Sequence, residues 1–280
     1  WQDMPEFSVF SLLSISKKAF ELYDDGITAV EDIPQDYEFT REPLKIIRDC
    51  WKEKKELFIN KEKVNEALSK LSYPLFHLDF ETFTPTLPIY SNTSPSQVIP
   101  FQYSLHIEHI DNTLEHKEYL AEDPLIDPRE ALICRLLNDM KGDSSVVVYS
   151  NYESTTLKNL ADEFPQYSEE LLSIKSRLWD LMEIFNKRYI NFYQLKNKYS
   201  LKYVMPLLVP KMSNKYLDLK ESGSVSFGVE ASNAFIQLMT ERDQNVVDSI
   251  REGLLEYCKL DTESMVESLR AVIKLNSTKG

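Results

Sequence analysis

Cysteine is scarce in this sequence: there are three in 280 residues, and no two of them form a CxxC pair. An odd number of cysteines at these spacings argues against a disulfide framework and against a zinc site built from cysteines. The sequence also lacks an apolar run near the roughly 18–20 residues of a bilayer-spanning helix, so we expect no membrane association. It contains no internal repeat and no low-complexity tract.

Basic residues are also fewer than acidic ones. The chain has 32 Lys and Arg against 45 Asp and Glu, a formal net charge of −13. This balance argues against the broad basic surface of a general nucleic-acid-binding protein. The exception is segment 187–217, which holds seven basic and no acidic side chains. Contact with nucleic acid is therefore expected to be local and sensitive to salt.

The chain begins with Trp1 rather than methionine, and no signal-peptide pattern follows it. We therefore expect a piece of a longer, soluble, cytoplasmic protein. Its 280 residues, 42% of them hydrophobic, can build a substantial core in one large domain with a smaller appendage.

Two regions of the chain differ in pattern. Residues 1–72 show amphipathic helical spacing, with Asn60 placed to cap one helix, and predict a helical N-terminal module. Residues 73–280 begin with alternating strands and continue with strand and helices, including a helical pattern over 168–188 and a final pair of helices that break near Asp243 or Asn245. This order predicts an α/β domain with a mixed sheet flanked by helices.

Two carboxylates, Asp79 and Glu81, stand inside the apolar run LFHLDFETF. On a strand, residues i and i+2 lie on the same face. Two close anions repel each other unless a cation joins them, and hard oxygen ligands suit Mg²⁺ or Mn²⁺. The sequence therefore predicts a divalent-metal site on this strand.

A pair of metal ions about 4 Å apart needs further carboxylates. Glu153 begins a helix directly after the strand SVVVYSN. Asp261 lies in a strong helical pattern, and Tyr257, four residues earlier, shares its helix face. We expect Asp79, Glu81, Glu153 and Asp261 to converge, with Tyr257 beside Asp261.

Each of these residues has a purely structural alternative. Glu153 can be a first-turn acid that the helix dipole favours. Three other acids compete with it for the ligand position: Asp143, Asp162 and Asp180. The pair Tyr257 and Asp261 can form a solvated helix face, and Cys258 between them has the character of a small buried filler.

The basic segment interleaves lysines with aromatic residues. Lysines that contact phosphates and rings that stack on bases are what a groove for single-stranded nucleic acid requires. The alternative is a core helix over YSLKYVMPLL whose lysines extend to solvent. The residues predicted to contact nucleic acid are Lys196, Lys198, Tyr199 and Lys202 in this segment, and Thr82, Phe83 and Asn151 beside the carboxylates.

The order of the motifs resembles the DEDD, or DnaQ-like, exonuclease superfamily: LDFET, an acid after a strand, then Tyr-x-x-x-Asp on a late helix. The last motif is similar to that of the tyrosine subclass. More narrowly, LDFETFTPTLPIY, YSLKYVMPLLVP and LLEYCKLDTESMV are similar to an uncharacterised bacterial family, a domain of unknown function with a predicted nuclease fold. Members of that family often carry a second nuclease domain upstream, which implies such a domain in the full-length protein.

The resemblance implies an RNase H-like fold and hydrolysis of single-stranded DNA or RNA from the 3′ end with two Mg²⁺ or Mn²⁺ ions. It implies that Asp79 bridges both ions and that Glu81 and Asp261 hold the ion that activates the attacking water. Glu153 would help to hold the ion on the leaving-group side, and Tyr257 would orient the water.

The second motif departs from the superfamily pattern, which usually ends in Asp. Glu153 is one methylene longer, a change that favours Mn²⁺ over Mg²⁺. The departure leaves open a catalytically silent RNase H-like module that positions nucleic acid for the upstream nuclease or binds a partner protein. The presence of all four acids and the tyrosine favours the enzyme, and the tyrosine argues against an RNase H-like endonuclease.

Overall fold

The computed structural model describes residues 4–14, 16–221, 225 and 228–278. The chain forms two compact units. The first comprises residues 1–70, 182–207 and 273–280, and the second comprises residues 71–181 and 208–272. The first unit therefore includes two segments that the sequence analysis assigned to residues 73–280.

The first unit is mainly helical, with an apolar core formed by residues of the N-terminal helices. The predicted cap at Asn60 is confirmed, because its Oδ1 accepts a hydrogen bond of 3.1 Å from the backbone N–H of Lys63. Two short strands pair in antiparallel fashion. The elements are α1 (Val9–Leu12), α2 (Lys17–Asp24), η1 (Val30–Asp32), α3 (Glu42–Lys52), β1 (Phe58–Ile59), α4 (Lys61–Leu68), α8 (Met182–Asn186), β7 (Ile190–Asn191), η3 (Tyr193–Leu195) and α9 (Leu201–Leu208).

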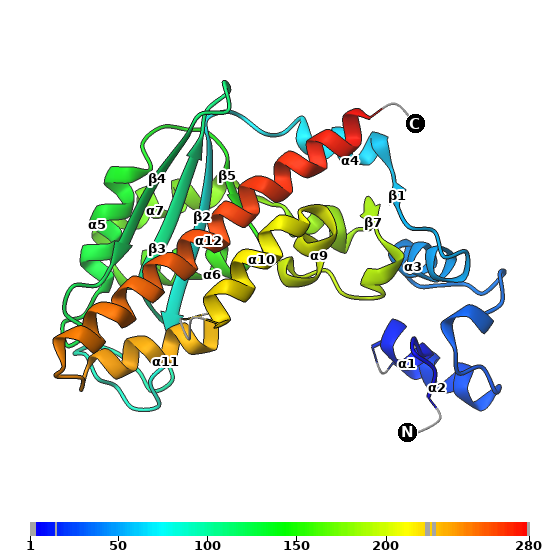
Figure 1. The fold of residues 1–280 in the computed structure, drawn as a ribbon, viewed down its shortest axis with the longest axis horizontal. Helices are drawn as coiled ribbons and strands as arrows, with labels where there is room; N and C mark the ends of the chain where they lie inside the picture. The colour runs from blue at the N-terminus through cyan, green and yellow to red at the C-terminus, as the bar shows by residue number, and fades with distance from the viewer. Residues whose placement is uncertain (1–3, 15, 222–224, 226–227, 279–280) are drawn as a thin grey trace. The chain divides into compact units, whose positions relative to one another are not determined.

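The second unit is built on a five-stranded mixed sheet with the order β4-β3-β2-β5-β6 (Figure 1). Strand β3 is antiparallel to both β2 and β4, whereas β2, β5 and β6 are parallel to one another. The strands are β2 (Leu75–Phe83), β3 (Ile99–Glu108), β4 (Leu114–Leu120), β5 (Val146–Val148) and β6 (Leu178–Asp180). The predicted fold class, α/β with an RNase H-like mixed sheet flanked by helices, is confirmed.

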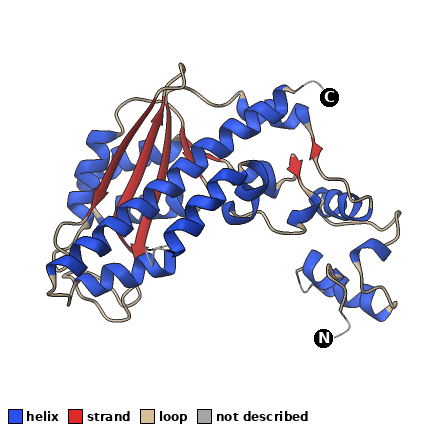
Figure 2. Ribbon diagram, viewed as in Figure 1, coloured by secondary structure: helices blue, strands red, loops and turns tan. Residues whose placement is uncertain are grey.

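Helices cover both faces of this sheet (Figure 2). The helices of the unit are α5 (Arg129–Asp139), α6 (Tyr152–Glu163), η2 (Pro165–Tyr167), α7 (Ser168–Ser176), α10 (Pro210–Glu221), α11 (Gly228–Leu238) and α12 (Gln244–Ser277). On one face, Leu78 and Phe80 of β2 pack against α5, α6 and α7. On the other face, Phe83 packs against Phe101 and Phe235 in a cluster with residues of α11 and α12.

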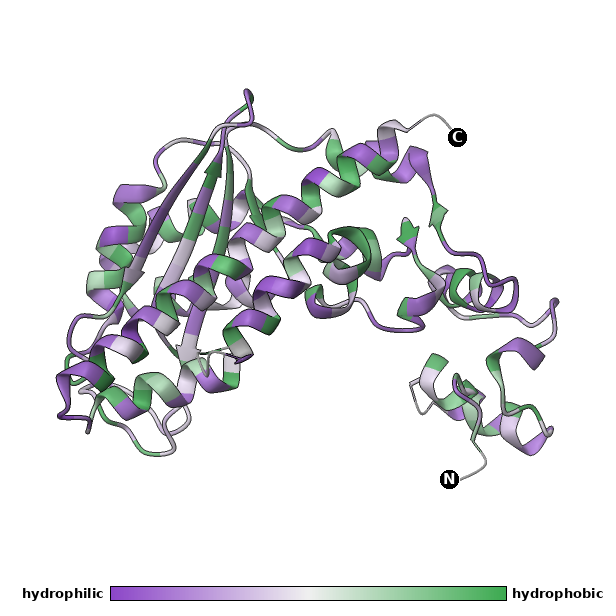
Figure 3. Ribbon diagram, viewed as in Figure 1, coloured by the Kyte–Doolittle hydropathy of each residue, from purple (hydrophilic) through white to green (hydrophobic). Residues whose placement is uncertain are grey.

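Helix α12 lies across the sheet and carries hydrophobic and hydrophilic residues in alternation along its length (Figure 3). Beneath it, the Thr262 hydroxyl lies 2.7 Å from both Ser104 Oγ and His106 Nδ1 of β3. This interface is therefore polar as well as apolar, and it covers the face of β2 that carries the odd-numbered residues. In the described part of the chain, no helix combines the length and apolar composition of a bilayer span.

One strand contradicts the sequence analysis. Residues 168–188 were expected to be helical, but Leu178–Asp180 form β6, which runs parallel to β5 at the edge of the sheet. The segment has helical spacing of its apolar residues, and pairing with β5 overrides that local pattern. The break between the last two helices, predicted near Asp243 or Asn245, is confirmed at the first position, because α11 ends at Leu238 and α12 begins at Gln244.

Candidate metal centre

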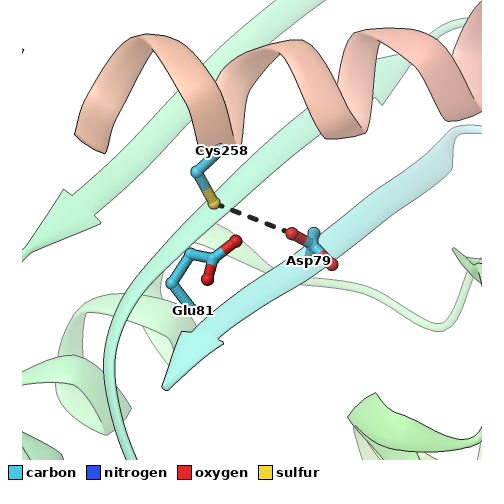
Figure 4. A group of neighbouring side chains, drawn as sticks. All are labelled: Asp79, Glu81 and Cys258. Atoms are coloured by element: carbon cyan, nitrogen blue, oxygen red, sulfur yellow. Dashed lines mark hydrogen bonds between the residues drawn. The ribbon is translucent and has the colours of Figure 1, made fainter. Parts of the chain in front are cut away.

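Strand β2 presents Asp79 and Glu81 on the same face, toward helix α12 (Figure 4). The alternation of side chains along a strand explains this placement. The register with β3 shifts between Glu81 and Thr82, so the ladder is irregular directly after the second carboxylate. Glu81 is only 7% exposed, whereas Asp79 is half-buried, so the second carboxylate is the more desolvated of the two.

Helix α12 adds a thiol to this position. Cys258 is fully buried, and its Sγ lies 3.8 Å from Asp79 Oδ2 as a hydrogen-bond donor. Ligand atoms of Asp79, Glu81 and Cys258 all lie within 4.8 Å of one another. The sequence analysis treated Cys258 as a filler. Its position three residues before Asp261, on the same helix face, is the spacing that could have placed it beside the carboxylates.

Glu153 reaches the cluster from the first turn of α6, after β5. The turn is strained, because Ser150 has a φ of 131° in the region that favours glycine. Two hydrogen bonds hold it: the Ser150 N–H donates to Asp180 Oδ1 at 3.0 Å, and the Tyr152 N–H donates to Ser150 Oγ at 3.2 Å. Glu153 is 3% exposed, its charge acts on Asp79, and its Oε2 has no hydrogen-bond partner.

The rival acids have other positions. Asp180 accepts the hydrogen bond from Ser150 and so supports the turn before Glu153. Asp162 forms an exposed ion pair of 2.6 Å with Lys158 on α6, and Asp143 is exposed on the loop before β5. Of the four candidates, Glu153 is the one whose charge contributes to the raised pKa of Asp79.

Two tyrosines contact Asp261 on α12. Tyr257 hydrogen-bonds to its carboxylate, as the four-residue helical spacing predicts. Tyr216 of α10 donates a hydrogen bond of 2.5 Å to Asp261 Oδ1 and lies 3.1 Å from Ser264 Oγ. Sequence reasoning missed Tyr216, since no spacing rule connects a residue of α10 to α12.

Burial and mutual repulsion dominate the electrostatics of the four carboxyl groups. Burial raises the pKa of Asp79 and of Glu81 well above the usual range, and repulsion from Asp261 and Glu153 adds to the effect in both. Burial also raises the pKa of Glu153 to about 7 and that of Asp261 to about 6. Without a cation, the cluster therefore retains protons near neutral pH, and a divalent cation is the natural compensation.

The neighbouring donors stay neutral. Burial, followed by repulsion from nearby carboxylates, raises the pKa of the Tyr257 and Tyr216 phenols and of the Cys258 thiol. Both tyrosines therefore act as hydrogen-bond donors to Asp261 rather than as bases.

The residues predicted to contact nucleic acid beside the carboxylates have different environments. Asn151 is exposed at the start of α6, and the Thr82 hydroxyl hydrogen-bonds to the Tyr152 hydroxyl. Phe83, in contrast, is 1% exposed, and its ring packs among the other aromatic rings of the core. A buried ring offers no surface to a base, so Phe83 has a packing role instead of the predicted contact.

The predicted lysines belong to the first unit. The ammonium group of Lys196 already has partners within that unit, because its Nζ lies 2.9 Å from Glu6 Oε1 and over the Trp51 ring. Lys198 and Lys202 are exposed, and both lie over the ring of Tyr203. Tyr199 lies against the guanidinium of Arg188. Helix α9 confirms the helical alternative for part of the segment, and the contact with nucleic acid stays a prediction.

The chain is similar in sequence to one family model and one protein, and no activity is known for either. An uncharacterized protein of Mycoplasma genitalium is 27% identical over 237 residues, which cover 78% of this chain and 34% of that protein. The chain thus spans about a third of the length of that relative. No solved structure matches the chain. Residues 76–200, which include Asp79, Glu81 and Glu153, match the family model of a domain of unknown function (DUF2779).

Proposed function

We propose that this chain is a divalent-metal-dependent 3′-to-5′ exonuclease that hydrolyses phosphodiester bonds of single-stranded DNA or RNA. The observation that carries the proposal is the pair Asp79 and Glu81 on β2, which share a possible ligand cluster and on which the charges of Glu153 and Asp261 act. The motif order that resembles the DEDD superfamily supports the exonuclease class and the polarity.

The donor set fits divalent cations. Carboxylates with raised pKa values are stabilised in their charged form by a nearby cation. The Oε2 atom of Glu153, in addition, has no hydrogen-bond donor. Carboxylate oxygens are the ligands that Mg²⁺ and Mn²⁺ prefer. Asp79, Glu81, Glu153 and Asp261 would hold them. When bound, such ions neutralise charge on the phosphate oxygens and lower the pKa of a water molecule.

The chain's own residues position the carboxylates. Tyr216 and Tyr257 both donate hydrogen bonds to Asp261, so its carboxylate has a fixed orientation. The raised pKa of Tyr257 keeps its hydroxyl protonated at neutral pH, which suits a group that orients a water molecule and does not take its proton. The turn that Asp180 supports holds Glu153 in the buried position.

The substrate would approach between the end of β2 and the start of α6. Thr82, Asn151 and the half-exposed Tyr152 lie at these ends and offer polar and aromatic contacts to a nucleotide. Contact of the exposed Lys198 and Lys202 of the first unit with phosphates is a separate proposal, and it makes binding sensitive to salt.

The test is degradation of labelled single-stranded DNA and RNA with Mg²⁺, with Mn²⁺ and with a chelator. Asp79→Asn should abolish the metal-dependent activity while leaving the circular dichroism spectrum unchanged. Asp162→Asn is the matched control, because this acid is exposed on α6 and ion-paired outside the cluster. Equal activity of the wild type and Asp79→Asn would refute the proposed site.

The second candidate is a catalytically silent module that serves an upstream nuclease domain. One observation favours it: the chain spans only 34% of its Mycoplasma relative, so that protein contains other regions that could supply an activity. Intact oligonucleotides under every metal condition, from a folded chain that binds Mn²⁺, would select this second candidate.

A further inference from the structure

The thiol of Cys258 on α12 points toward Asp79 of β2 (Figure 4). Its Sγ donates a weak hydrogen bond to Asp79 Oδ2 over 3.8 Å. The side chain is fully buried, and its ligand atom lies within 4.8 Å of ligand atoms of both Asp79 and Glu81. Space-filling alone does not require the thiol to face a carboxylate, because a buried cysteine packs equally well against apolar neighbours.

The spacing suits two ligands of one ion. A metal ion holds a thiolate sulfur at about 2.3 Å and a carboxylate oxygen at about 2.0–2.2 Å, so two such atoms are about 3.5 Å apart in tetrahedral geometry and about 4.5 Å apart at most. The 3.8 Å between Cys258 Sγ and Asp79 Oδ2 falls between these values. No change of backbone is needed for both atoms to bind the same ion.

A second observation, independent of the cysteine, points to a ligand at the same place. Glu153 is only 3% exposed, its charge acts on Asp79, and its Oε2 has no hydrogen-bond partner. Buried acceptors are rarely left without a donor. A cation beside Asp79 would supply the missing interaction.

We infer that Cys258 is a metal ligand that shares an ion with Asp79 and Glu81, and that the centre therefore favours a borderline transition-metal ion such as Co²⁺ or Zn²⁺ over Mg²⁺. Thiolate ligands select softer ions, whereas carboxylates alone suit Mg²⁺ and Mn²⁺. On binding, the S–H bond breaks, its proton passes to solvent, and the sulfur–metal bond forms. The inference rests on the metal centre of the proposed function but not on nuclease activity.

The test is a Co²⁺ titration of the metal-free full chain under reducing conditions, followed by the near-ultraviolet charge-transfer band of a cobalt–thiolate bond. Cys258→Ser changes one atom and should remove the band, and Cys258→Ala should do the same. The wild type and Cys134→Ser, which alters an exposed cysteine, should both show the band. We expect Cys258→Ser to lose at least about tenfold in Co²⁺ affinity, or about 1.4 kcal/mol.

Mn²⁺ binding, measured by electron paramagnetic resonance, separates the two proposals. If the wild type binds Mn²⁺ and Asp79→Asn does not, but no thiolate band forms with Co²⁺, the role of Cys258 is overturned and the metal centre stands. A band that persists in Cys258→Ser or at full strength in Asp79→Asn also overturns it. If the wild type binds neither ion, the proposed metal centre fails as well.

Discussion

Replacement of Glu153 by Gln tests the electrostatic description of the cluster without any assumption about activity. In the metal-free protein, burial raises the pKa of Glu153 from 4.5 to about 7. The folded state therefore holds a proton that the unfolded state releases between these pH values, and the unfolding free energy falls as the pH rises through that window. Gln has the shape of the protonated acid and does not titrate.

The magnitude follows from the pKa. A rise from 4.5 to about 7 corresponds to about 3 kcal/mol at pH 8 and to less than about 1 kcal/mol at pH 5. We therefore expect Glu153→Gln to stabilise the metal-free chain by about 3 kcal/mol at pH 8, a Tm increase of about 6–12 °C for a chain of this size, and to have little effect at pH 5.

The assay is thermal or urea unfolding in chelator at pH 5, 6, 7 and 8. Asp162→Asn on the same helix is the matched control, since it removes one exposed ion pair worth about 0.3–0.5 kcal/mol and should show no such rise with pH. Added Mn²⁺ should stabilise the wild type more than Glu153→Gln, so that the wild type becomes the more stable of the two proteins. A difference between Glu153→Gln and wild type that is the same at pH 5 and pH 8 would refute the reasoning.

Three further predictions concern the carboxylate cluster and the interface between α12 and β3. Mn²⁺ affinity should fall as the pH is lowered from 8 to 5, because the ion must displace protons from Glu153 and Asp261; calorimetry in two buffers of different ionisation enthalpy counts those protons. Tyr216→Phe removes a hydrogen bond that lowers the pKa of Asp261, so the midpoint of that pH dependence should move upward; an unchanged midpoint would exclude the contact. Thr262→Val should cost about 1–3 kcal/mol in urea unfolding, because Ser104 and His106 lose a buried partner, whereas the exposed Thr155→Val should cost less; equal losses would contradict the account.

The alternation of LFHLDFETF was enough to predict both the central strand and the shared face of Asp79 and Glu81. The spacing of Tyr257 and Asp261 was equally informative, because helical periodicity fixes which side chains meet. In both cases the prediction depended on a local rule that tertiary contacts did not change.

The missed features depend on contacts between elements distant in sequence. Strand β6 is three residues long within a segment of helical spacing, and pairing with β5 determines its conformation. Tyr216 reaches Asp261 from another helix, so no period in the sequence relates them. The burial of Phe83 follows from packing against β3 and α11, which the pattern near the carboxylates does not reveal.

The central claim is that the cluster around Asp79 cleaves nucleic acid from the 3′ end, and a comparison of 5′-labelled and 3′-labelled single strands tests it most directly. The account predicts that, with Mn²⁺, the 5′ label appears in a ladder that shortens one nucleotide at a time and the 3′ label is released as a mononucleotide at once, both absent in Asp79→Asn. Internal cleavage of both substrates, or intact strands from a folded chain that binds Mn²⁺, would contradict it.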